Sequence, residues 1–343
     1  MVTCTGILVA DIFAADLPKI SAPGEVTFAP QGIEMHTGGH SANVSINLRQ
    51  MGLAEGRVSS VGAVGDDLFG EFIESTLKSH GVVTHLQRVR ETGSCKNLVL
   101  VVKGEDHRYH IDAGASSYLS PDHVRSVVAK ERPMIFYVGG TGMLAKFDEK
   151  LAYILRTAKG YDCLTFIDPV APRNGEWGFL FPALKWIDIF HCNNIEASGI
   201  TGQKDLRKAA RALIKEGVKL AIISMGERGL FAQTRRVTLE MPALRVPVID
   251  PSGAGDAFCS GTIYKLVKKT SGIQLDISGL SAEDLTNIFL EGVAAGAACV
   301  TAVGTTTAVT RENVDRLLNE HGLEILKSTS ATTTRTDSGK FAN

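Results

Sequence analysis

Short runs of β-branched and apolar residues alternate with helical patterns along most of this chain, and Gly-, Asp- or Asn-rich turns separate several of them. Strands that alternate with helices form βαβ units, which build a largely parallel sheet covered by helices on both faces. The expected strands are residues 5–10, 57–61, 134–138, 163–167, 187–190 and 219–224. We therefore predict an α/β fold. Ligands of such sheets bind outside the carboxyl ends of the strands, where Asp11, Asp168 and Asn193 fall.

Two stretches break this alternation and predict a second, smaller sheet. Residues 12–36 contain several prolines, and residues 92–113 contain two extended runs, KNLVLVV and RYHID, around the turn-like KGED. We expect both stretches to fold together as one flap over the mouth of the main sheet. Residues 327–343 lack periodicity and large apolar side chains, so we expect a disordered tail there. The predicted large domain comprises residues 1–11, 37–91 and 114–326.

Composition narrows the class of protein further. Of the 343 residues, 44% are hydrophobic and 21% are charged, and the formal net charge is -1. These values exclude disordered and membrane classes and argue against nucleic acid or an anionic membrane as the main partner. The cysteines form no C-x-x-C pair, which argues against zinc and against a secreted disulfide scaffold. The first residues lack a basic region, so we predict no signal peptide and a cytoplasmic location.

The segment DPSGAGDAFCSGTIYKL, residues 250–266, carries the strongest local signal. Gly253 and Gly255 allow the backbone to approach a ligand closely, and the helix that follows presents unpaired N–H groups to an anion. Asp256 beside such a cradle is suited to accept a hydroxyl proton while the cradle holds a phosphoryl group. The alternative is structural, because a carboxylate at a helix start is also a good N-cap.

The segment TGGHSANVSINLRQMGL, residues 37–53, predicts a glycine turn followed by an amphipathic helix. Gly38 and Gly39 form the turn, and Ser41 is placed to cap the helix. The side chain of Asn43, in the first helical turn, offers both a donor and an acceptor to sugar hydroxyls. A purely structural helix cap is the alternative.

Two further segments follow expected strands. In HCNNIEASGITG, Asn193 and Glu196 lie three residues apart, and Glu196 is suited to hold Mg²⁺ through water. The same spacing is that of a capping box, which is the alternative. In SMGERGLFA, Gly226 and Gly229 are suited to line a nucleotide phosphate site, and a hairpin turn is the alternative.

Several motifs of other enzyme classes are absent from the sequence. The chain has no G-x-x-x-x-G-K-[ST], which excludes a P-loop enzyme, and no G-x-S-x-G nucleophile elbow. GGTG at residues 139–142 lacks the complete dinucleotide fingerprint, which argues against a nicotinamide-dependent oxidoreductase. The histidines show no H-E-x-x-H spacing of a metal site.

In this order, the motifs resemble those of the ribokinase-like (PfkB-type) family of carbohydrate and nucleoside kinases, from about residue 3 to about residue 318. The motifs are GGHSAN with its helix, VGAVGDDLFG at 61–70, N-x-x-E at 193–196, SMGERG at 224–229 and D-x-x-GAGD at 250–256. The resemblance implies a three-layer α/β sandwich with a mainly parallel sheet and a small β-sheet lid, which often forms the dimer contact in the family. It also implies ATP-dependent transfer of the γ-phosphoryl group to a hydroxyl of a small carbohydrate, with Mg²⁺ as cofactor.

Site residues follow from the resemblance position by position. Asp256 matches the catalytic base that deprotonates the acceptor hydroxyl. The anion hole matches Gly253, Ala254 and Gly255. The sugar-hydroxyl contacts match Asp11, Gly38, Gly39 and Asn43. The groups that organise Mg²⁺ and the nucleotide match Asn193, Glu196, Ser224, Gly226 and Gly229, and the adenine pocket matches Val293 and Gly296. Many members also bind K⁺, and those mainly backbone ligands match Asp250, Ser252, Cys299 and Gly304.

The chain departs from the family pattern at several positions. Pro251 replaces the usual threonine, which affects the expected cation site. The chain has Gly139-Gly140 where ribose-specific members carry a glutamate, and His40 where they carry a lysine, so ribose is disfavoured. DPVAPRNGEW is similar to the D-x-N-x-R segment of fructokinase-like and ketodeoxygluconate-kinase-like members, with Val170 in place of the asparagine. Arg173 is suited to meet an acidic or hydroxyl-rich substrate, and a solvated loop arginine is the alternative. We expect a hexose, ketose or sugar acid as acceptor; the alternatives are a nucleoside kinase of the same family and a catalytically inactive nucleotide or sugar sensor.

Overall fold

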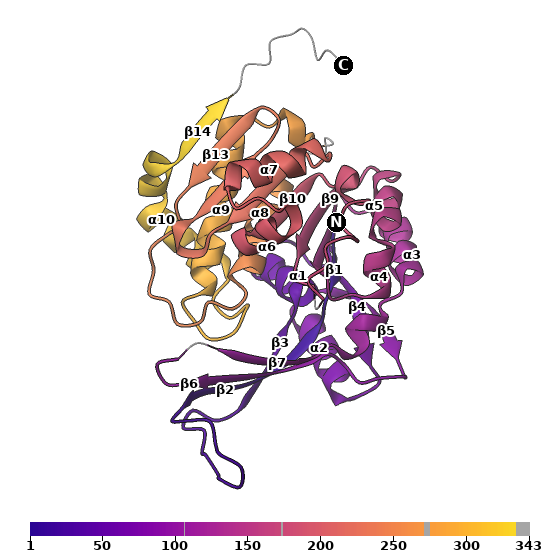
Figure 1. The fold of residues 1–343 in the computed structure, drawn as a ribbon, viewed down its shortest axis with the longest axis vertical. Helices are drawn as coiled ribbons and strands as arrows, with labels where there is room; N and C mark the ends of the chain where they lie inside the picture. Colours follow the sequence, from indigo (N-terminus) through magenta and orange to yellow (C-terminus); the bar gives the residue numbers. More distant parts are fainter. Residues whose placement is uncertain (106, 173, 271–274, 334–343) are drawn as a thin grey trace.

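A mostly parallel main sheet forms the centre of the protein (Figure 1). The computed structural model describes residues 1–105, 107–172, 174–270 and 275–333, and within these ranges the main sheet has ten strands in the order β14-β13-β12-β11-β10-β9-β8-β1-β4-β5. The seven neighbouring strands β11, β10, β9, β8, β1, β4 and β5 run parallel, whereas β12, β13 and β14 continue the sheet antiparallel. The strands are β1 (Val2–Gly6), β4 (Val58–Gly65), β5 (Val83–Val89), β8 (Ile135–Thr141), β9 (Leu164–Pro169), β10 (Ile189–Asn193), β11 (Leu220–Ser224), β12 (Leu230–Gln233), β13 (Val237–Met241) and β14 (Ser330–Thr333).

Helices cover both faces of the main sheet because successive side chains of its strands point to opposite faces and both sets are apolar. In β8, for example, Ile135 and Tyr137 pack on one layer of helices, and Phe136 and Val138 pack on the other. The first layer contains α1 (His40–Gln50), α8 (Ala254–Lys269), α9 (Ala282–Cys299) and α10 (Arg311–Ser328). The second contains α3 (Pro121–Glu131), α4 (Lys146–Glu149), α5 (Leu151–Lys159), α6 (Asn194–Thr201) and α7 (Leu206–Lys215). The predicted three-layer α/β fold is confirmed.

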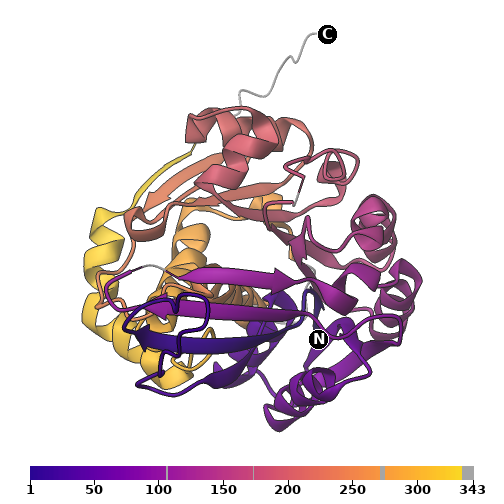
Figure 2. The ribbon, with the colours of Figure 1, turned by 60° about the horizontal axis from the view of Figure 1, so that its bottom comes forward.

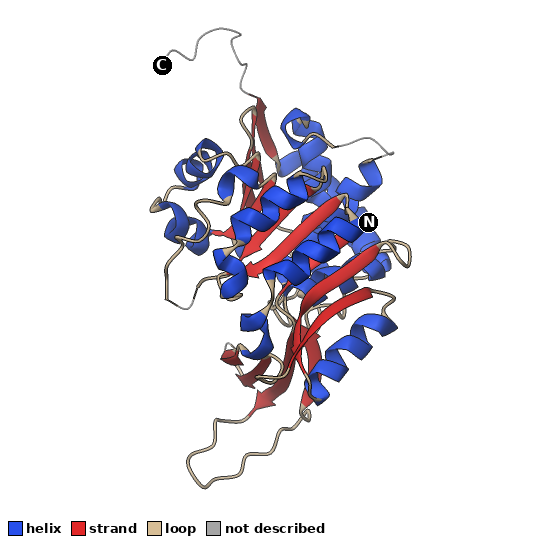
Figure 3. Cartoon of the chain, turned by 90° about the vertical axis from the view of Figure 1, so that its right-hand side faces the viewer, coloured by secondary structure: helices blue, strands red, loops and turns tan. Residues whose placement is uncertain are grey.

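The small sheet, which consists of β2 (Val9–Leu17), β3 (Glu34–Gly38), β6 (Lys96–Val102) and β7 (Arg108–Asp112), projects from the large domain (Figures 1 and 3). Its order is β3-β2-β6-β7, in which only the β2–β6 pair is parallel. Helix α2 (Leu68–Ser79) packs beside β4, β5 and the base of β2. Viewed from below, the small sheet lies across the front of the main sheet (Figure 2). The small sheet formed by the two stretches that break the alternation is confirmed.

The N-terminal strand differs from the prediction. Residues 5–10 are not one strand, because β1 ends at Gly6 and β2 begins at Val9. The backbones of β1 and β8 approach closely at the end of β1, since a Cβ atom on Gly6 would lie 2.0 Å from the carbonyl oxygen of Gly139. Asp11 therefore lies within the small sheet, paired with His36, and not at the carboxyl end of a main-sheet strand. The predicted boundary of the large domain at residue 11 does not coincide with the start of the small sheet.

The predicted tail also differs. Helix α10 continues to Ser328, and β14 pairs with the edge strand β13, so residues 327–333 are ordered structure and not a disordered tail. An edge strand adds backbone hydrogen bonds without burying large apolar side chains, which explains why the apolar pattern did not predict it. Residues 334–343 of the predicted tail lie outside the described residues. None of the helices in the described ranges is long and apolar enough to cross a membrane.

Candidate active site

The carboxylate of Asp256 lies in the first turn of α8, at the carboxyl-end side of the main sheet. Gly253 is the N-cap of this helix, with a left-handed backbone (φ 77°), and no side chain caps it. The alternative interpretation of Asp256 as a helix cap is therefore wrong. Asp256 is only 8% exposed, and its Oδ2 atom accepts a hydrogen bond of 2.8 Å from Asn43 Nδ2.

A chain of hydrogen bonds holds this carboxylate in place. Thr305 Oγ1 donates to Asn43 Oδ1 at 2.7 Å, and Asn43 in turn donates to Asp256. Gly253 is required next to Thr305, because a Cβ atom at position 253 would lie 2.6 Å from the Thr305 Cβ. Asp256 Oδ1, the second oxygen, is buried and has no hydrogen-bond partner among the described residues. Such an oxygen is the free acceptor that a general base requires.

A second acidic side chain, Asp168 of β9, lies near Asp256 and is enclosed by residues of β8, β10 and α8. Tyr137 donates a hydrogen bond of 3.0 Å to Asp168 Oδ2, and His191 Nδ1 lies 2.9 Å from Asp168 Oδ1. The thiol of Cys259 lies 3.4 Å from both Asp168 Oδ2 and His191 Nδ1. Of this cluster, the sequence placed only Asp168 at a strand end. It gave no signal for the others, which lie in apolar strand and helix patterns.

The electrostatics of the two carboxyl groups differ. Burial raises the pKa of Asp256 above its ordinary value, and Asp168 adds to the rise while His40, Asn43 and His191 oppose it. Burial also acts on Asp168, but the charge and hydrogen bond of His191 outweigh it and hold the pKa of Asp168 below its ordinary value. Conversely, burial disfavours a charged His191, yet Asp168 raises the pKa of this imidazole overall. Asp168 and His191 therefore form a buried contact in which each group favours the charged form of the other.

The predicted sugar-contact residues come together at the base of the small sheet. Asp11 Oδ1 accepts a hydrogen bond of 2.9 Å from Asn97 Nδ2, and burial raises the pKa of Asp11 to about 6. Gly38 lies directly against this carboxylate: a Cβ atom at position 38 would fall 1.9 Å from Asp11 Oδ2. Gly39 is the N-cap of α1, so the predicted cap, Ser41, is wrong. Ser41 is buried and donates to the backbone oxygen of Cys4 at 2.7 Å.

The predicted nucleotide residues lie at the ends of β10 and β11. Asn193 and Ser224 are direct neighbours in the parallel pairing of these strands. Asn193 and Glu196 form a complete capping box at the start of α6. The alternative interpretation of this spacing therefore describes their local geometry correctly. Burial raises the pKa of Glu196. The loop with Gly226 and Gly229 is a tight hairpin connection between β11 and β12, as the alternative predicted.

The predicted adenine residues lie in α9, where it packs against α8. Val293 is buried in the core on this side of the sheet. A Cβ atom on Gly296 would lie 3.2 Å from the backbone oxygen of Ala254, so the helices approach closely there. Val293 therefore contributes to packing between the helices, and Gly296 allows that packing.

The predicted cation residues converge around Asp250. Its Oδ1 accepts the backbone N–H of Ser252 at 2.8 Å, and its Oδ2 accepts that of Gly304 at 3.2 Å. The thiol of Cys299 lies 3.3 Å from the backbone oxygens of both Ser252 and Thr305. These two carbonyl oxygens therefore face the Cys299 thiol, and the Asp250 carboxylate accepts two backbone N–H groups and lies 3.3 Å from His107 Nε2.

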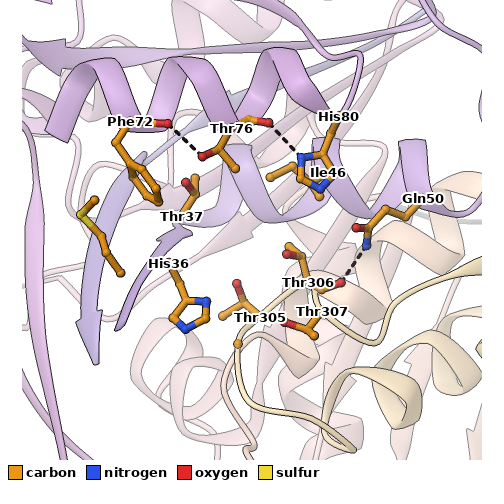
Figure 4. A pocket seen from close by; sticks show the side chains of 12 residues that line it. His36, Thr37, Ile46, Gln50, Phe72, Thr76, His80, Thr305, Thr306 and Thr307 are labelled. Carbon is orange, nitrogen blue, oxygen red and sulfur yellow. Dashed lines mark hydrogen bonds between the residues drawn. The ribbon is translucent and has the colours of Figure 1, made fainter. Parts of the chain in front are cut away.

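A separate cavity of about 370 Å³ lies on the other side of Thr305 (Figure 4). Its walls come from β3, α1, α2 and the loop 304–307, and none of Asp11, Gly38, Gly39, Asn43 and Asp256 lines it. Thr37 faces this cavity with a buried hydroxyl that has no hydrogen-bond partner among the described residues. The cavity is thus distinct from the Asp256 site, although both touch Thr305.

The sequence of the chain matches a known protein family. The sequence model of the pfkB family carbohydrate kinases matches residues 1–312. The chain belongs to the pfkB family. It is therefore a kinase that transfers a phosphoryl group to an alcohol group of a carbohydrate-type acceptor.

Relatives within the pfkB family carry several different names. The chain is 28% identical to a deoxyribokinase of Salmonella typhi over an aligned region of 253 residues. This region covers 72% of this chain and 78% of the deoxyribokinase. Its fold is similar to that of a ribokinase from Giardia lamblia, with a TM-score of 0.78 and 19% identity over 93% of this chain and 98% of the other. A fructokinase from Xylella fastidiosa, solved with bound ATP, has a TM-score of 0.75 and 21% identity over 94% and 98% of the two chains.

Proposed function

We propose that this protein is an ATP-dependent sugar kinase, with a hexose, ketose or sugar acid as acceptor and Asp256 as general base. One observation carries the proposal: a buried carboxylate with an unpartnered oxygen sits in the first turn of α8, directly after the Gly253-Ala254-Gly255 turn. Helix N-termini attract phosphate groups through free N–H groups and the helix dipole. The proposed base, Asp256, therefore lies next to the proposed anion cradle of residues 253–255.

In the proposed reaction, Asp256 Oδ1 takes the proton of the acceptor hydroxyl. The hydroxyl oxygen then forms a bond to the γ-phosphorus of ATP, and the bond between this phosphorus and the bridging oxygen breaks, which leaves ADP. Backbone N–H groups of residues 253–255 stabilise the negative charge of the transferring group. Bound Mg²⁺ would neutralise phosphate charge, and we assign Glu196 and Asn193 to its organisation through water, since Glu196 is an oxygen donor at the mouth of the strands.

Nucleotide and cation contacts extend this proposal. We assign the loop of Ser224, Gly226 and Gly229 to the nucleotide phosphates and the surroundings of Val293 and Gly296 to adenine; the fructokinase with bound ATP shares this fold. We assign Asp250, Ser252, Cys299 and Gly304 to a K⁺ ion next to the anion cradle; the oxygen atoms that support this assignment are the Asp250 carboxylate and the Ser252 and Thr305 carbonyl groups near Cys299.

The acceptor contacts support a sugar other than ribose. We assign Asp11, Gly38, Gly39 and Asn43 to its hydroxyl groups. A Cβ atom on Gly139 would lie 2.4 Å from the Cβ of His40 and 2.6 Å from the hydroxyl of Tyr137. No side chain fits at position 139 with this backbone, so the glutamate of the ribose-specific pattern has no place there.

The test is ADP release from Mg-ATP, with K⁺ present, across fructose, ribose, ketodeoxygluconate, inositol, adenosine, inosine and cytidine. We expect turnover with one of the sugar or sugar-acid acceptors and much lower turnover with ribose and the nucleosides. Strong turnover with a nucleoside would instead support the nucleoside kinase. ATP binding without turnover of any acceptor would support the inactive sensor.

We also propose that the small sheet acts as a lid and forms a homodimer contact. Its loop exposes large apolar side chains: Val26 is 78%, Phe28 83% and Ile33 68% exposed. Exposed apolar groups gathered in one region are typical of protein interfaces.

For this contact we expect light scattering to give twice the chain mass of 36.7 kDa. Phe28→Glu is expected to raise the dissociation constant of the dimer by about tenfold or more, because it buries a charge in the contact. Phe181→Glu is the control, since Phe181 is exposed on the large domain. A monomeric parent protein, or equal effects of both variants, would contradict the contact.

A further inference from the structure

The cavity beside Thr305 takes no part in the proposed reaction (Figure 4). Its volume of about 370 Å³ lies within the range of about 300 to 1,000 Å³ that is typical of small-molecule sites. Strand β3, helices α1 and α2 and the loop 304–307 each contribute to its wall, so segments that are far apart in the sequence meet there. The cavity is large enough to hold a molecule of the size of a sugar.

Thr37 of β3 gives the clearest sign that this cavity receives a ligand. Its side chain lines the cavity and is only 6% exposed. Its Oγ1 atom has no hydrogen-bond partner among the residues that the structure describes. A buried hydroxyl group without a partner lowers the stability of the free protein. A bound molecule with a hydroxyl group of its own would supply the missing partner.

Further hydrogen-bonding atoms on α1 and α2 surround the same space. His80 Nδ1 lies 2.9 Å from the carbonyl oxygen of Thr76. A carbonyl oxygen can only accept, so Nδ1 carries the hydrogen atom and Nε2 of the neutral ring is an acceptor. Gln50 Nε2 donates to the carbonyl oxygens of Thr306 and Val309, which leaves its Oε1 atom as an acceptor. The wall therefore offers acceptors to the O–H groups of a ligand.

The wall of the cavity carries little charge. Within the described ranges it includes no lysine, arginine, aspartate or glutamate. His36, one of its two histidines, lies 2.9 Å from the Glu34 carboxylate, which compensates the charge of the protonated ring. Met35, Ile46 and Phe72 add apolar surface, against which the C–H groups of a sugar ring can pack. This wall therefore suits a neutral hydroxylated molecule better than a nucleotide or a phosphorylated sugar, whose charge would need cations.

We propose that this cavity binds a neutral, polyhydroxylated small molecule of the sugar or polyol class, at a site separate from the acceptor site. The inference goes beyond the proposed function, because none of the residues assigned to the acceptor or to ATP lines the cavity. The two sites are nevertheless adjacent. Thr305 lines the cavity and also donates the hydrogen bond of 2.7 Å to Asn43, which in turn donates to Asp256. A ligand in the cavity therefore lies next to the hydrogen bonds that hold the proposed base.

The test is an NMR titration of the full chain, with isotope-labelled threonine methyl groups, in the absence of ATP. The probes are fructose, glucose and inositol, and a fructose phosphate is the anionic counterpart. Thr306 and Thr307 line the cavity and are not assigned to the acceptor, so their methyl signals report on this site. We expect both signals to shift and to saturate with at least one neutral probe, and the fructose phosphate to bind more weakly.

Two variants examine the site from its wall. Thr76→Met fills part of the cavity and is expected to raise the dissociation constant by about tenfold or more. Thr157→Met is the matched control: both threonines are half-buried on a helix and donate to the carbonyl oxygen four residues earlier, but Thr157 lies outside the cavity. The control is expected to bind as the parent protein does.

Thr37→Val keeps the shape of the side chain and removes only the unpartnered hydroxyl group. We expect this variant to melt at the same temperature as the parent protein or at a higher one, because a buried unpaired group is lost. Binding of the neutral probe is expected to weaken roughly twofold to tenfold, which is the usual contribution of one hydrogen bond. This variant tests the site even where Thr76→Met does not fold.

The proposal would be overturned if no neutral probe gave a saturable shift of the Thr306 and Thr307 signals, or if a folded Thr76→Met bound the probe as the parent protein does. Equal or tighter binding of the fructose phosphate would contradict the neutral class of ligand. The titration requires no turnover. If a sugar binds in the cavity but no acceptor is phosphorylated, the proposed function fails and the cavity site stands; if turnover is found without binding in the cavity, the reverse holds.

Discussion

Asp256→Asn is expected to lower kcat by about a hundredfold to ten-thousandfold, which is the usual contribution of a general base. Asparagine has nearly the same shape and can still accept the hydrogen bond from Asn43 Nδ2. It cannot take the proton of the acceptor hydroxyl. ATP affinity is expected to remain within a few-fold of the parent value, because the backbone N–H groups of residues 253–255 are unchanged.

Turnover is measured as ADP release with one acceptor, and ATP affinity is measured by calorimetry. Asp122→Asn is the matched control, since Asp122 also lies in the first turn of a helix, α3, but its side chain is 82% exposed and pairs with Arg125. Turnover of the control is expected to equal that of the parent. If Asp256→Asn turned over acceptor at a near-normal rate, Asp256 would not be the base.

Gly38→Ala is expected to reduce kcat/KM for the acceptor by about tenfold to a hundredfold. The new Cβ atom would lie 1.9 Å from Asp11 Oδ2, so the carboxylate must leave its position against the glycine turn. Hydrogen bonds to a charged group contribute about 1.5 to 3 kcal/mol, which corresponds to this range of affinity. The loss is expected in the acceptor KM, with the KM for ATP nearly unchanged.

Gly178→Ala provides the control for this substitution. Gly178 is exposed, and a Cβ atom there would meet no heavy atom within 4 Å. Initial rates with acceptor and ATP varied independently separate the two KM values. An unchanged acceptor KM in Gly38→Ala would show that Asp11 does not bind the acceptor, and an equal rise in both KM values would indicate general damage to the fold.

Much of the fold follows from local patterns in the sequence. The alternation of apolar strands and helices predicted the parallel sheet, because strands buried on both faces read as continuous apolar runs. The first strand was placed too late because the apolar pattern runs on through Gly6, where the chain passes from one sheet to the other. The edge strand β14 was missed since its small polar residues gain backbone pairing and not burial.

The candidate site was predictable only where glycine and polar residues form motifs. Asp256 and Asn43 each stand in such a motif, and the structure joins them by a hydrogen bond. The partners of Asp168 were not predictable, because His191 and Cys259 lie inside apolar patterns that indicate only a buried face. Their proximity depends on which strands are neighbours in the sheet, and the order of strands is set by the whole fold and not by any local segment.

The hydrogen bonds around Asp256 also have a consequence for synthesis of the chain on the ribosome. Asn43 is separated by 213 residues from Asp256 and by 262 residues from Thr305. At usual rates of elongation, roughly 5 to 20 residues per second, the second interval takes about 13 to 50 seconds. Asn43 therefore waits for Asp256 during most of this interval and for Thr305 until its end. Strand β1 waits for a shorter time for β8, its neighbour in the sheet. A nascent chain, or one terminated before residue 256, therefore contains the glycine turn at residues 38 and 39 but lacks Asp256, the proposed base.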